Sequence, residues 1–287
     1  DQSFLQRGYV FYMEGSRGGE TLEWCGTSDD CFLRFDAEAQ RRALAFMRRN
    51  VTCGKPFYLA WWPLRNTLAQ TPRVRRVIDE MVGELEQPGL DQAVGEVLDA
   101  LESLGVAENT LVVAMSANGP MIYEAFGQAG HREGPFRGGK GDLYDGGVHV
   151  PFIASWPATI PSGQTFDPPV IALDIVCTAV AVAGANAQTQ SEMEGVNLIP
   201  FVTGEKQVPP HEELFWRGGD GNQWSVLSAD GTKHLQAKAG KEPELYYLPD
   251  DVSEAHDLLA GQPQRARELY AKWSKWNERN VPCRLLG

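Results

Sequence analysis

The sequence predicts an α/β protein that ends in a small antiparallel sheet and a helix. Two observations carry this prediction. Short apolar runs of strand length alternate with longer segments whose apolar residues recur every three to four positions, as in amphipathic helices. Beyond about residue 205, short strand-like segments separated by Gly-Asp and Asp-Gly turns replace this alternation. We therefore expect an α/β body over residues 1–205 and a small α+β subdomain over residues 206–287.

In the first half of the body we expect two helices and one strand. Asp36 suits the N-cap of a helix over residues 37–49. The aromatic run at 56–62 has the length and composition of a buried strand. Residues 90–104 place their apolar side chains on one helical face, and Gly105 suits the end of that helix.

The second half of the body brings a loop to the end of a strand. Residues 110–115 are apolar on both faces, as in a buried parallel strand, and 116–119 form the loop at its carboxyl end. Sites in open α/β sheets form at such ends. A Gly-rich loop over 127–147, a strand over 148–156 and a helix over 174–185 follow.

The C-terminal subdomain is expected to hold a hairpin-rich sheet and a closing helix. Its turn at 229–232 contains Asp-Gly, a strong hairpin signal. The expected strands cover 214–217, 224–228, 233–236 and 245–248, and the helix covers 262–280.

Composition excludes several classes of function. The chain has 287 residues and a formal net charge of −12. Such an acidic balance argues against non-specific nucleic-acid binding, which needs a positive field to displace counterions. No apolar run reaches the roughly 18 residues that a membrane span needs. The start at Asp1 shows no leader-like pattern, so we expect either no signal peptide or a sequence that begins after its cleavage.

Several sequence blocks follow one another at a characteristic spacing. The first is a helix start at 91–95 with a strand at 109–113, and a Ser-Ala-Asn-Gly loop follows at 116–119. Next come a Gly-Gly-Lys loop at 136–141 and an Asp-Gly-Gly segment at 144–152. The last is an aromatic segment at 245–254. In this order the blocks resemble the type I sulfatases, the formylglycine-dependent branch of the alkaline phosphatase superfamily. The resemblance covers the chain from about residue 35 onward. It implies an alkaline-phosphatase-like mixed sheet flanked by helices.

The resemblance also implies a chemistry with four parts. A hydrated formylglycine, made from a cysteine in a Cys-x-Pro-Ser-Arg motif, is the nucleophile of such enzymes. A divalent cation, usually calcium, polarises the sulfate oxygens, and lysines and histidines neutralise sulfate and protonate the leaving alcohol. Carboxylates hold the metal, because calcium takes roughly six to eight oxygen ligands.

This chain departs from the family pattern at its catalytic positions. None of Cys25, Cys31 and Cys53 stands in a nucleophile motif. The paired aspartates and the Lys-x-His element of the family would lie before residue 1. Two changes fall inside the chain: Ala117 replaces the metal-binding aspartate, and Arg65 takes the place of a pocket histidine. Arginine stays charged and cannot act as a general acid near neutral pH.

The remaining candidate site residues each have an alternative interpretation. Asn118 could ligate a metal weakly, or it could cap backbone groups in a turn. Lys140 could contact sulfate from its Gly-rich loop, or it could be an ordinary solvated lysine. His131 could line the pocket or lie on the surface. Arg65 and Arg137 could join Lys140 in a cationic pocket that needs no metal.

Three functions are open on this basis, and whether the chain is an enzyme is not decided. We favour a sulfatase-like protein that is inactive on its own and acts as a binding or structural subunit. The alternative is the C-terminal portion of an active, arylsulfatase-like enzyme whose nucleophile and remaining ligands lie on another chain or on residues outside the sequence. The third is a metal-independent hydrolase that reuses Lys140, although no Gly-x-Ser-x-Gly elbow appears.

These functions lead to expectations about cofactors, partners and location. We expect no cofactor on this chain alone, and calcium if the alternative holds. A sheet without its first strands exposes an edge, so we expect a protein partner over the missing N-terminal part, with sulfate or a sulfated ligand as a further possibility. The glycosylation sequon at Asn50 and a possible Cys25–Cys31 disulfide favour a secretory or lumenal location.

Overall fold

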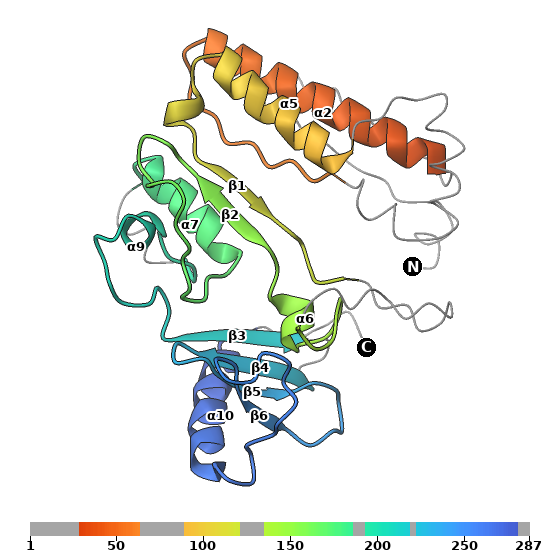
Figure 1. The fold of residues 1–287 in the computed structure, drawn as a ribbon, viewed down its shortest axis with the longest axis vertical. Coiled ribbons are helices and arrows are strands. Elements are labelled where there is room, and N and C mark those ends of the chain that lie inside the picture. Colours follow the sequence, from red (N-terminus) through yellow and green to blue (C-terminus); the bar gives the residue numbers. More distant parts are fainter. Residues whose placement is uncertain (1–28, 64–88, 121–134, 186–192, 219–221, 281–287) are drawn as a thin grey trace. The chain divides into compact units, whose positions relative to one another are not determined.

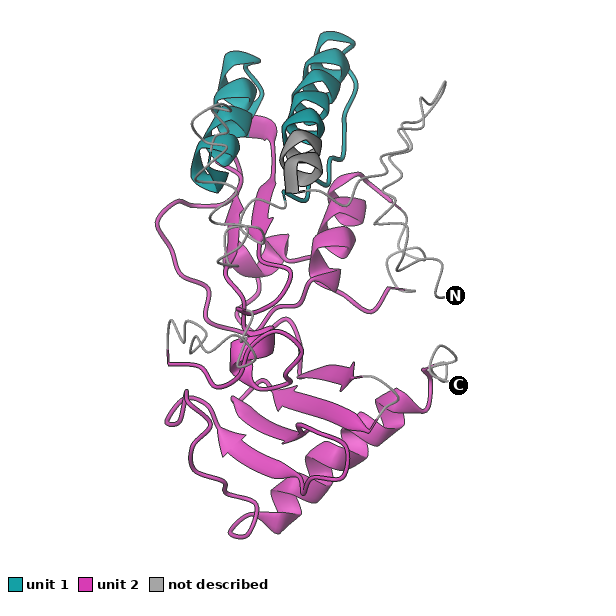
Figure 2. Cartoon of the chain, turned by 90° about the vertical axis from the view of Figure 1, so that its right-hand side faces the viewer, with its two compact units in different colours: residues 1–108 teal, residues 109–287 magenta. Residues whose placement is uncertain are grey.

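The computed structural model describes residues 29–63, 89–120, 135–185, 193–218 and 222–280, and the chain divides into two compact units. The units cover residues 1–108 and 109–287 (Figure 2). The predicted subdomain boundary near residue 205 lies inside the second unit and stays a prediction. In the described part of the chain, no helix combines the length and apolarity that a membrane crossing requires.

The first unit pairs two helices, α2 (Asp29–Thr52) and α5 (Leu90–Ser103). Small apolar side chains meet between them, and Gln40 is buried there as well. The Gln40 side chain donates to the Ala93 carbonyl at 3.4 Å and to the Glu96 carboxylate at 2.6 Å. A polar side chain thus fixes the register of this helix pair.

The predicted ends of these helices were right for α5 and wrong for α2. Gly105 adopts a positive φ of 70° just past α5. Its N–H donates to the Glu102 carbonyl, and the Val106 N–H donates to the Leu101 carbonyl, so the helix ends in a Schellman motif. Asp36, however, lies inside α2, which begins at Asp29. An aspartate that suits an N-cap can also stand within a helix.

The predicted strand at 56–62 is wrong. The segment does not form a strand, and the side chains of residues 57–63 alternate between partly buried and exposed. Tyr58 is 60% exposed and Trp62 is 84% exposed, while Phe57 packs edge-on against Phe46. A strand needs a ladder partner, and this apolar segment has none among the described residues.

The second unit begins with the strands β1 (Val112–Met115) and β2 (Phe152–Ser155), which follow the short 3-10 helix η1 (Ala107–Asn109). They pair antiparallel, with Val112 opposite Ser155 and Met115 opposite Phe152 (Figure 1). The prediction of a parallel strand buried on both faces is therefore wrong for β1, because an apolar run indicates burial but not direction.

Three short helices accompany β1 and β2. The predicted strand over 148–156 begins only at Phe152, because α6 (Asp145–Val148) precedes it. The helix α7 (Leu173–Val182) confirms the expectation over 174–185. A further turn of helix, α9 (Ile199–Val202), was not expected.

The C-terminal part confirms the predicted sheet and helix. The strands β3 (Glu213–Gly218), β4 (Gln223–Ser228), β5 (Thr232–Gln236) and β6 (Glu244–Tyr247) form an antiparallel sheet in that order, and α10 (Pro263–Asn277) packs on it (Figure 1). The apolar core between them consists of Trp224, Val226, Leu245, Ala266, Leu269 and Trp273. A second cluster, made of Leu143, Leu235, Ala237 and Tyr246, joins the sheet to the segment before α6.

Glycines allow three segments of the second unit to approach at backbone distance. The Gly119 N–H donates to the Gly147 carbonyl at 3.1 Å. A Cβ atom on Gly119 would lie 1.7 Å from the Gly146 carbonyl oxygen, and one on Gly146 would lie 2.4 Å from the Arg137 carbonyl oxygen. The loop after β1, the Gly-rich loop and α6 therefore fit together only because these positions lack side chains.

Gly119→Ala is expected to lower the free energy of unfolding by about 1–3 kcal/mol, since backbone atoms must move to admit the methyl group. Gly95→Ala is the control. A Cβ atom on Gly95, inside α5, meets nothing within 4 Å, so it should stabilise that helix by about 0.5–1 kcal/mol. Urea denaturation followed by circular dichroism measures both changes. Wild-type stability in Gly119→Ala would contradict the close approach.

Candidate functional site

The loop that follows β1 is held by hydrogen bonds within itself. The Asn118 side chain is partly buried, and its Nδ2 donates to the Gly119 carbonyl at 2.7 Å. The Ser116 hydroxyl donates to the Asn118 carbonyl at 2.9 Å. Ala117 between them is exposed and offers only a methyl group. The loop thus has the local turn structure expected of an asparagine that caps backbone groups.

The described residues around this loop do not fit a calcium site. Calcium takes roughly six to eight oxygen ligands, several of them carboxylates. At this loop the side chains supply the amide oxygen of Asn118 and the hydroxyl of Ser116, and Ala117 supplies no donor. Over the described ranges, no group of three or more His, Cys, Asp and Glu side chains is placed to hold a metal ion.

The Gly-rich loop at 138–141 uses much of its backbone hydrogen bonding inside the protein. The Gly139 N–H donates to the Asp142 carboxylate at 3.0 Å. The Lys140 N–H donates to the Pro120 carbonyl at 2.8 Å. These two N–H groups therefore do not point into open space, where they could cradle an anion. The Lys140 side chain itself is exposed.

Arg137, at the start of this loop, is tied to the C-terminal sheet. Its Nη1 donates to the Tyr246 hydroxyl at 2.9 Å and to the Glu254 carbonyl at 3.0 Å. Its guanidinium lies 3.9 Å from the centre of the Tyr144 ring, a cation–π distance. Nη2 is 3.8 Å from the Glu244 carboxylate. Structural contacts thus engage the guanidinium that was predicted to line a ligand pocket.

Tyrosines complete this contact with the sheet. The Tyr144 hydroxyl donates to the Glu244 carboxylate. Burial raises the pKa of Tyr144 above its ordinary value, and the neighbouring Glu244 adds to the shift. Burial likewise raises the pKa of Tyr246 to about 12. Both tyrosines therefore keep their protons near neutral pH.

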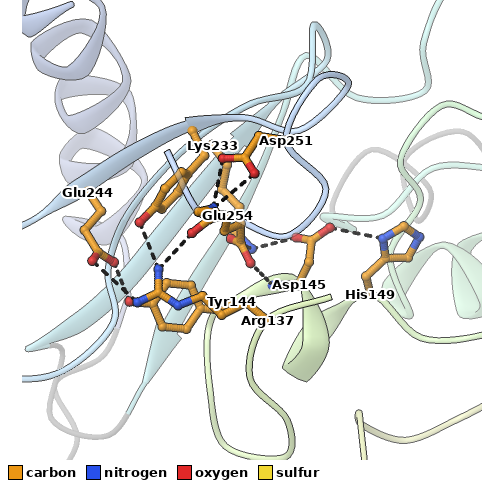
Figure 3. A network of polar contacts seen from close by, with 10 residues as sticks. Arg137, Tyr144, Asp145, His149, Lys233, Glu244, Asp251 and Glu254 are labelled. Carbon is orange, nitrogen blue, oxygen red and sulfur yellow. Dashed lines mark hydrogen bonds and ion pairs between the residues drawn. The ribbon is translucent and has the colours of Figure 1, made fainter. Parts of the chain in front are cut away.

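A buried ion cluster lies beside Arg137, where α6 meets β5 (Figure 3). Lys233 is fully buried, and its Nζ lies 2.6 Å from Asp145 Oδ1 and 3.0 Å from Glu254 Oε1. The other oxygen of Glu254 accepts the Asp145 N–H at 2.7 Å. The second oxygen of Asp145 lies 3.1 Å from Nδ1 of the exposed His149. One cation thus faces two carboxylates away from solvent.

The two carboxyls of the cluster titrate in opposite directions. Burial alone would raise the pKa of Asp145, but the hydrogen bonds and charges of His149 and Lys233 outweigh it and lower this pKa below 3.8. Burial raises the pKa of Glu254 above 4.5, and the charge of Lys233 only partly opposes the shift. Glu254 is therefore the carboxyl that accepts a proton first on acidification.

Sequence reasoning missed Lys233 and found only part of the candidate site. Lys233 stands two residues before the buried Leu235 on β5, so the strand period places both on one face. This two-residue period was the sequence feature from which the buried position of Lys233 could have been predicted. Of the predicted residues, Asn118, Arg137 and Lys140 lie in the segments that the glycines bring together. Arg65, His131 and the Cys25–Cys31 pair lie outside the residues whose side chains are described.

Glu254→Gln is expected to change how stability depends on pH. The raised pKa of Glu254 stabilises the folded protein below pH 4.5, and this contribution is lost as the pH rises through the folded-state value. The wild type should therefore lose stability relative to the variant as the pH rises from 4.5 toward neutrality. Denaturation at several pH values measures the difference, with the exposed Glu268→Gln as control. Parallel pH curves for wild type and Glu254→Gln would contradict it.

Comparisons with known proteins identify sulfatases as relatives of part of this chain. Residues 70–185 match the family model described as Sulfatase. The chain is 38% identical to rat (Rattus norvegicus) steryl-sulfatase over 130 residues, which are 44% of this chain and 22% of that protein. It is 32% identical to human (Homo sapiens) arylsulfatase A over 195 residues, 60% of this chain and 38% of that protein. The chain thus spans less than half of the length of these relatives.

Solved structures show the same fold. A Pseudoalteromonas sp. structure, the PsFucS1 sulfatase, superposes with a TM-score of 0.68 at 22% identity, over 93% of this chain and 58% of that chain. The structure of Ps i-CgsB in complex with k-i-k-neocarrahexaose gives a TM-score of 0.70 at 24% identity, over 92% of this chain and 58% of that chain. The predicted mixed α/β fold with a small antiparallel sheet is confirmed. The chain is therefore related to the sulfatases: residues 70–185 carry a sulfatase-family segment, and the protein has the sulfatase fold.

Proposed function

We propose that this chain is a sulfatase-like protein that does not hydrolyse sulfate esters on its own and serves as a binding or structural subunit. The alanine at position 117 carries the proposal. It stands in the loop where the family supplies a metal-binding carboxylate, and the Asn118 amide beside it donates to Gly119. Without that carboxylate, the loop lacks both a ligand and the negative charge that would offset a divalent cation.

The residues of this sequence contain no nucleophile motif, so a formylglycine would have to be supplied from outside them. A formylglycine-dependent reaction needs the cysteine motif, and none of the cysteines of this chain stands in one. Of the described cysteines, Cys53 is exposed in the turn after α2 and Cys177 is buried in α7. Membership of a fold family does not by itself supply activity.

A protein partner is part of the proposal, and α7 is the observation that favours one. Asp174 and Thr178 of this helix are buried, whereas Leu173 and Val176 are 49% and 47% exposed. A helix that buries polar side chains together with Cys177 and leaves other apolar side chains exposed suits a position between two covered sides. Ile153 of β2 is also 65% exposed. We propose that a polypeptide with the N-terminal sulfatase part covers these side chains.

In the alternative function, the same contact with a partner would complete a catalytic site. A partner that brings the nucleophile and the remaining carboxylates would complete a sulfuric ester hydrolase, and calcium would then bind to the complex. The chain spans 21% of mouse steryl-sulfatase and 47% of rat arylsulfatase G, which leaves room for such a complement. Ala117 weighs against this alternative, because it removes a ligand that the complement cannot replace at the same place.

We also propose a secretory or lumenal location, on the basis of the sequon at Asn50. The sequon asparagine, Asn50, lies near the end of α2, and its Nδ2 donates to the Phe46 carbonyl at 2.8 Å. A glycan at Asn50 would replace one of the two hydrogens on Nδ2 and leave the other able to donate. A shift in mass on deglycosylation, lost in Thr52→Ala, would support the location.

The purified chain is expected to turn over an aryl sulfate no faster than buffer does, with or without added calcium. Ala117→Asp should stay inactive, because a single restored carboxylate supplies neither the nucleophile nor a full ligand set. Ala117→Asn, which adds similar bulk without charge, is the matched control. Turnover that a chelator abolishes would overturn the proposal. Turnover only after addition of an N-terminal sulfatase polypeptide would establish the alternative.

Lys140→Ala is expected to weaken sulfate binding about two- to fivefold, the effect of one exposed charge. Titration of the chain with sulfate or a sulfated sugar measures the affinity. Lys238→Ala, which removes another exposed lysine of the second unit, should leave it unchanged. An affinity unaffected by Lys140→Ala would remove Lys140 from the proposed binding site.

A further inference from the structure

Lys233 is an unusual residue to find without solvent contact. It lies on β5 with 0% of its side chain exposed, two positions from the equally buried Leu235. Desolvation of an ammonium group is costly, and buried charges persist where they are paired and hydrogen-bonded. The partners of Lys233 are Asp145 and Glu254, and neither belongs to the C-terminal sheet. The ion cluster therefore joins separate segments rather than strengthening one.

Glu254 contacts the residues on either side of the 138–144 loop, which is the central part of the Gly-rich segment. Its backbone carbonyl accepts from Arg137 at 3.0 Å, directly before Gly138. Its carboxylate accepts the N–H of Asp145 at 2.7 Å, after the loop has ended. The loop between these points carries Lys140. Its two ends are thus held by one residue of the turn that follows β6.

The backbone of Glu254 is itself held in an uncommon conformation. Its φ is 50°, and it is a non-glycine residue with positive φ. Such a conformation is unfavourable and persists where surrounding contacts over-determine it. Asp251 provides part of that restraint, because its carboxylate accepts the N–H groups of Ala255 and His256 at 2.9 and 2.8 Å. Lys233 adds to this restraint by pairing with the Glu254 side chain.

We propose that Lys233 and Glu254 are positioning residues, which clamp both ends of the 138–144 loop to the C-terminal sheet and thereby place Lys140. The clamp is a property of the loop whether or not an anion binds. Its effect on sulfate rests on the binding proposed above. The sheet and its turn then act on the loop through Asp145 and Arg137, without contact to a ligand.

The charges around Lys233 explain why the clamp depends on it. Asp145 and Glu254 face the ammonium from two sides, and His149 adds its ring to Asp145. If Lys233 is replaced by methionine, two carboxylates remain close together without a cation. Their repulsion separates α6 from the turn at Glu254, and the loop ends lose their common anchor.

Hydrogen–deuterium exchange of the full chain tests the clamp. In Lys233→Met, peptides that cover residues 138–149 should exchange at least tenfold faster, because the N–H groups of Gly146, Gly147 and His149 donate to the carbonyls of Arg137, Tyr144 and Asp145, at the end of the loop that the clamp holds. Peptides from β4 and α10 should change less than twofold. A uniform increase over the whole sheet, or no increase in 138–149, would overturn the proposal.

Two further variants guard against a failure of Lys233→Met to fold. Arg137→Met removes the other tie at a side chain that is 40% exposed, and it should accelerate exchange in 138–142 alone. Lys233→Met/Glu254→Gln removes the repulsion and should return the exchange of 138–149 at least partway to wild type. Lys272→Met, which breaks an exposed pair with Glu213 on the same sheet, is the control and should leave the loop unchanged. A wild-type loop in Arg137→Met, or no return in the double variant, would contradict the clamp.

A sulfate titration separates this inference from the proposed function. If wild type binds sulfate through Lys140, Lys233→Met should lose at least as much affinity as Lys140→Ala does. If wild type binds no sulfate, the binding proposal fails, and the exchange experiment still decides whether Lys233 and Glu254 hold the loop. Faster loop exchange with unchanged sulfate affinity would show that the clamp does not place Lys140.

Discussion

The pairing of Lys233 with Asp145 and Glu254 is the interaction on which the second unit depends. A buried ion pair gains little over well-packed apolar groups, but removing one partner alone costs about 3–5 kcal/mol, because a charge is left without compensation. Here the three charges come from β5, from the start of α6 and from the turn after β6. The C-terminal sheet and the Gly-rich loop are thus joined by this ion cluster, and separating them would leave buried charges without a partner. The C-terminal sheet is in this sense part of the candidate site.

Backbone hydrogen bonds limit what the loops near Lys140 can still bind. Gly119 donates to Gly147, Gly139 donates to Asp142, and the Lys140 N–H donates to Pro120. Each of these bonds stabilises the close packing that the glycines permit, and each also removes a donor that an anion could otherwise use. Among the described residues of these loops, the exposed cationic side chains are Lys140 and Arg137, and contacts with Tyr144, Tyr246 and Glu254 already engage the guanidinium of Arg137. The ammonium group of Lys140 alone would give weak binding, which is consistent with the proposal that the chain needs a partner to form a complete site.

Sequence signals that act within a few residues predicted the elements that the structure confirms. The errors concern features that depend on contacts between residues distant in the sequence. The end of α5 at Gly105 and the hairpin at 229–232 follow from glycine conformation and turn chemistry, which act within a few residues. The direction of β1 and the absence of a ladder at 56–62 depend on which strands lie alongside, and an apolar run does not contain that information. The role of Lys233 was missed for a related reason. Its strand position predicts which face it occupies, but not that α6 and Glu254 cover that face.

The distribution of apolar side chains over α7 bears on how the chain exists in solution. Asp174 of this helix is fully buried, where it accepts the N–H groups of Ile171 and Val196 and contacts His211, so its inward orientation is fixed by specific bonds. The helix therefore cannot rotate to bury Leu173 and Val176 instead. Since water penalises that exposed surface and the hydrogen bonds of Asp174 forbid the rotation, we propose these side chains as the place where the partner polypeptide would lie. The same reasoning applies to Ile153, because its direction is set by the ladder between β1 and β2.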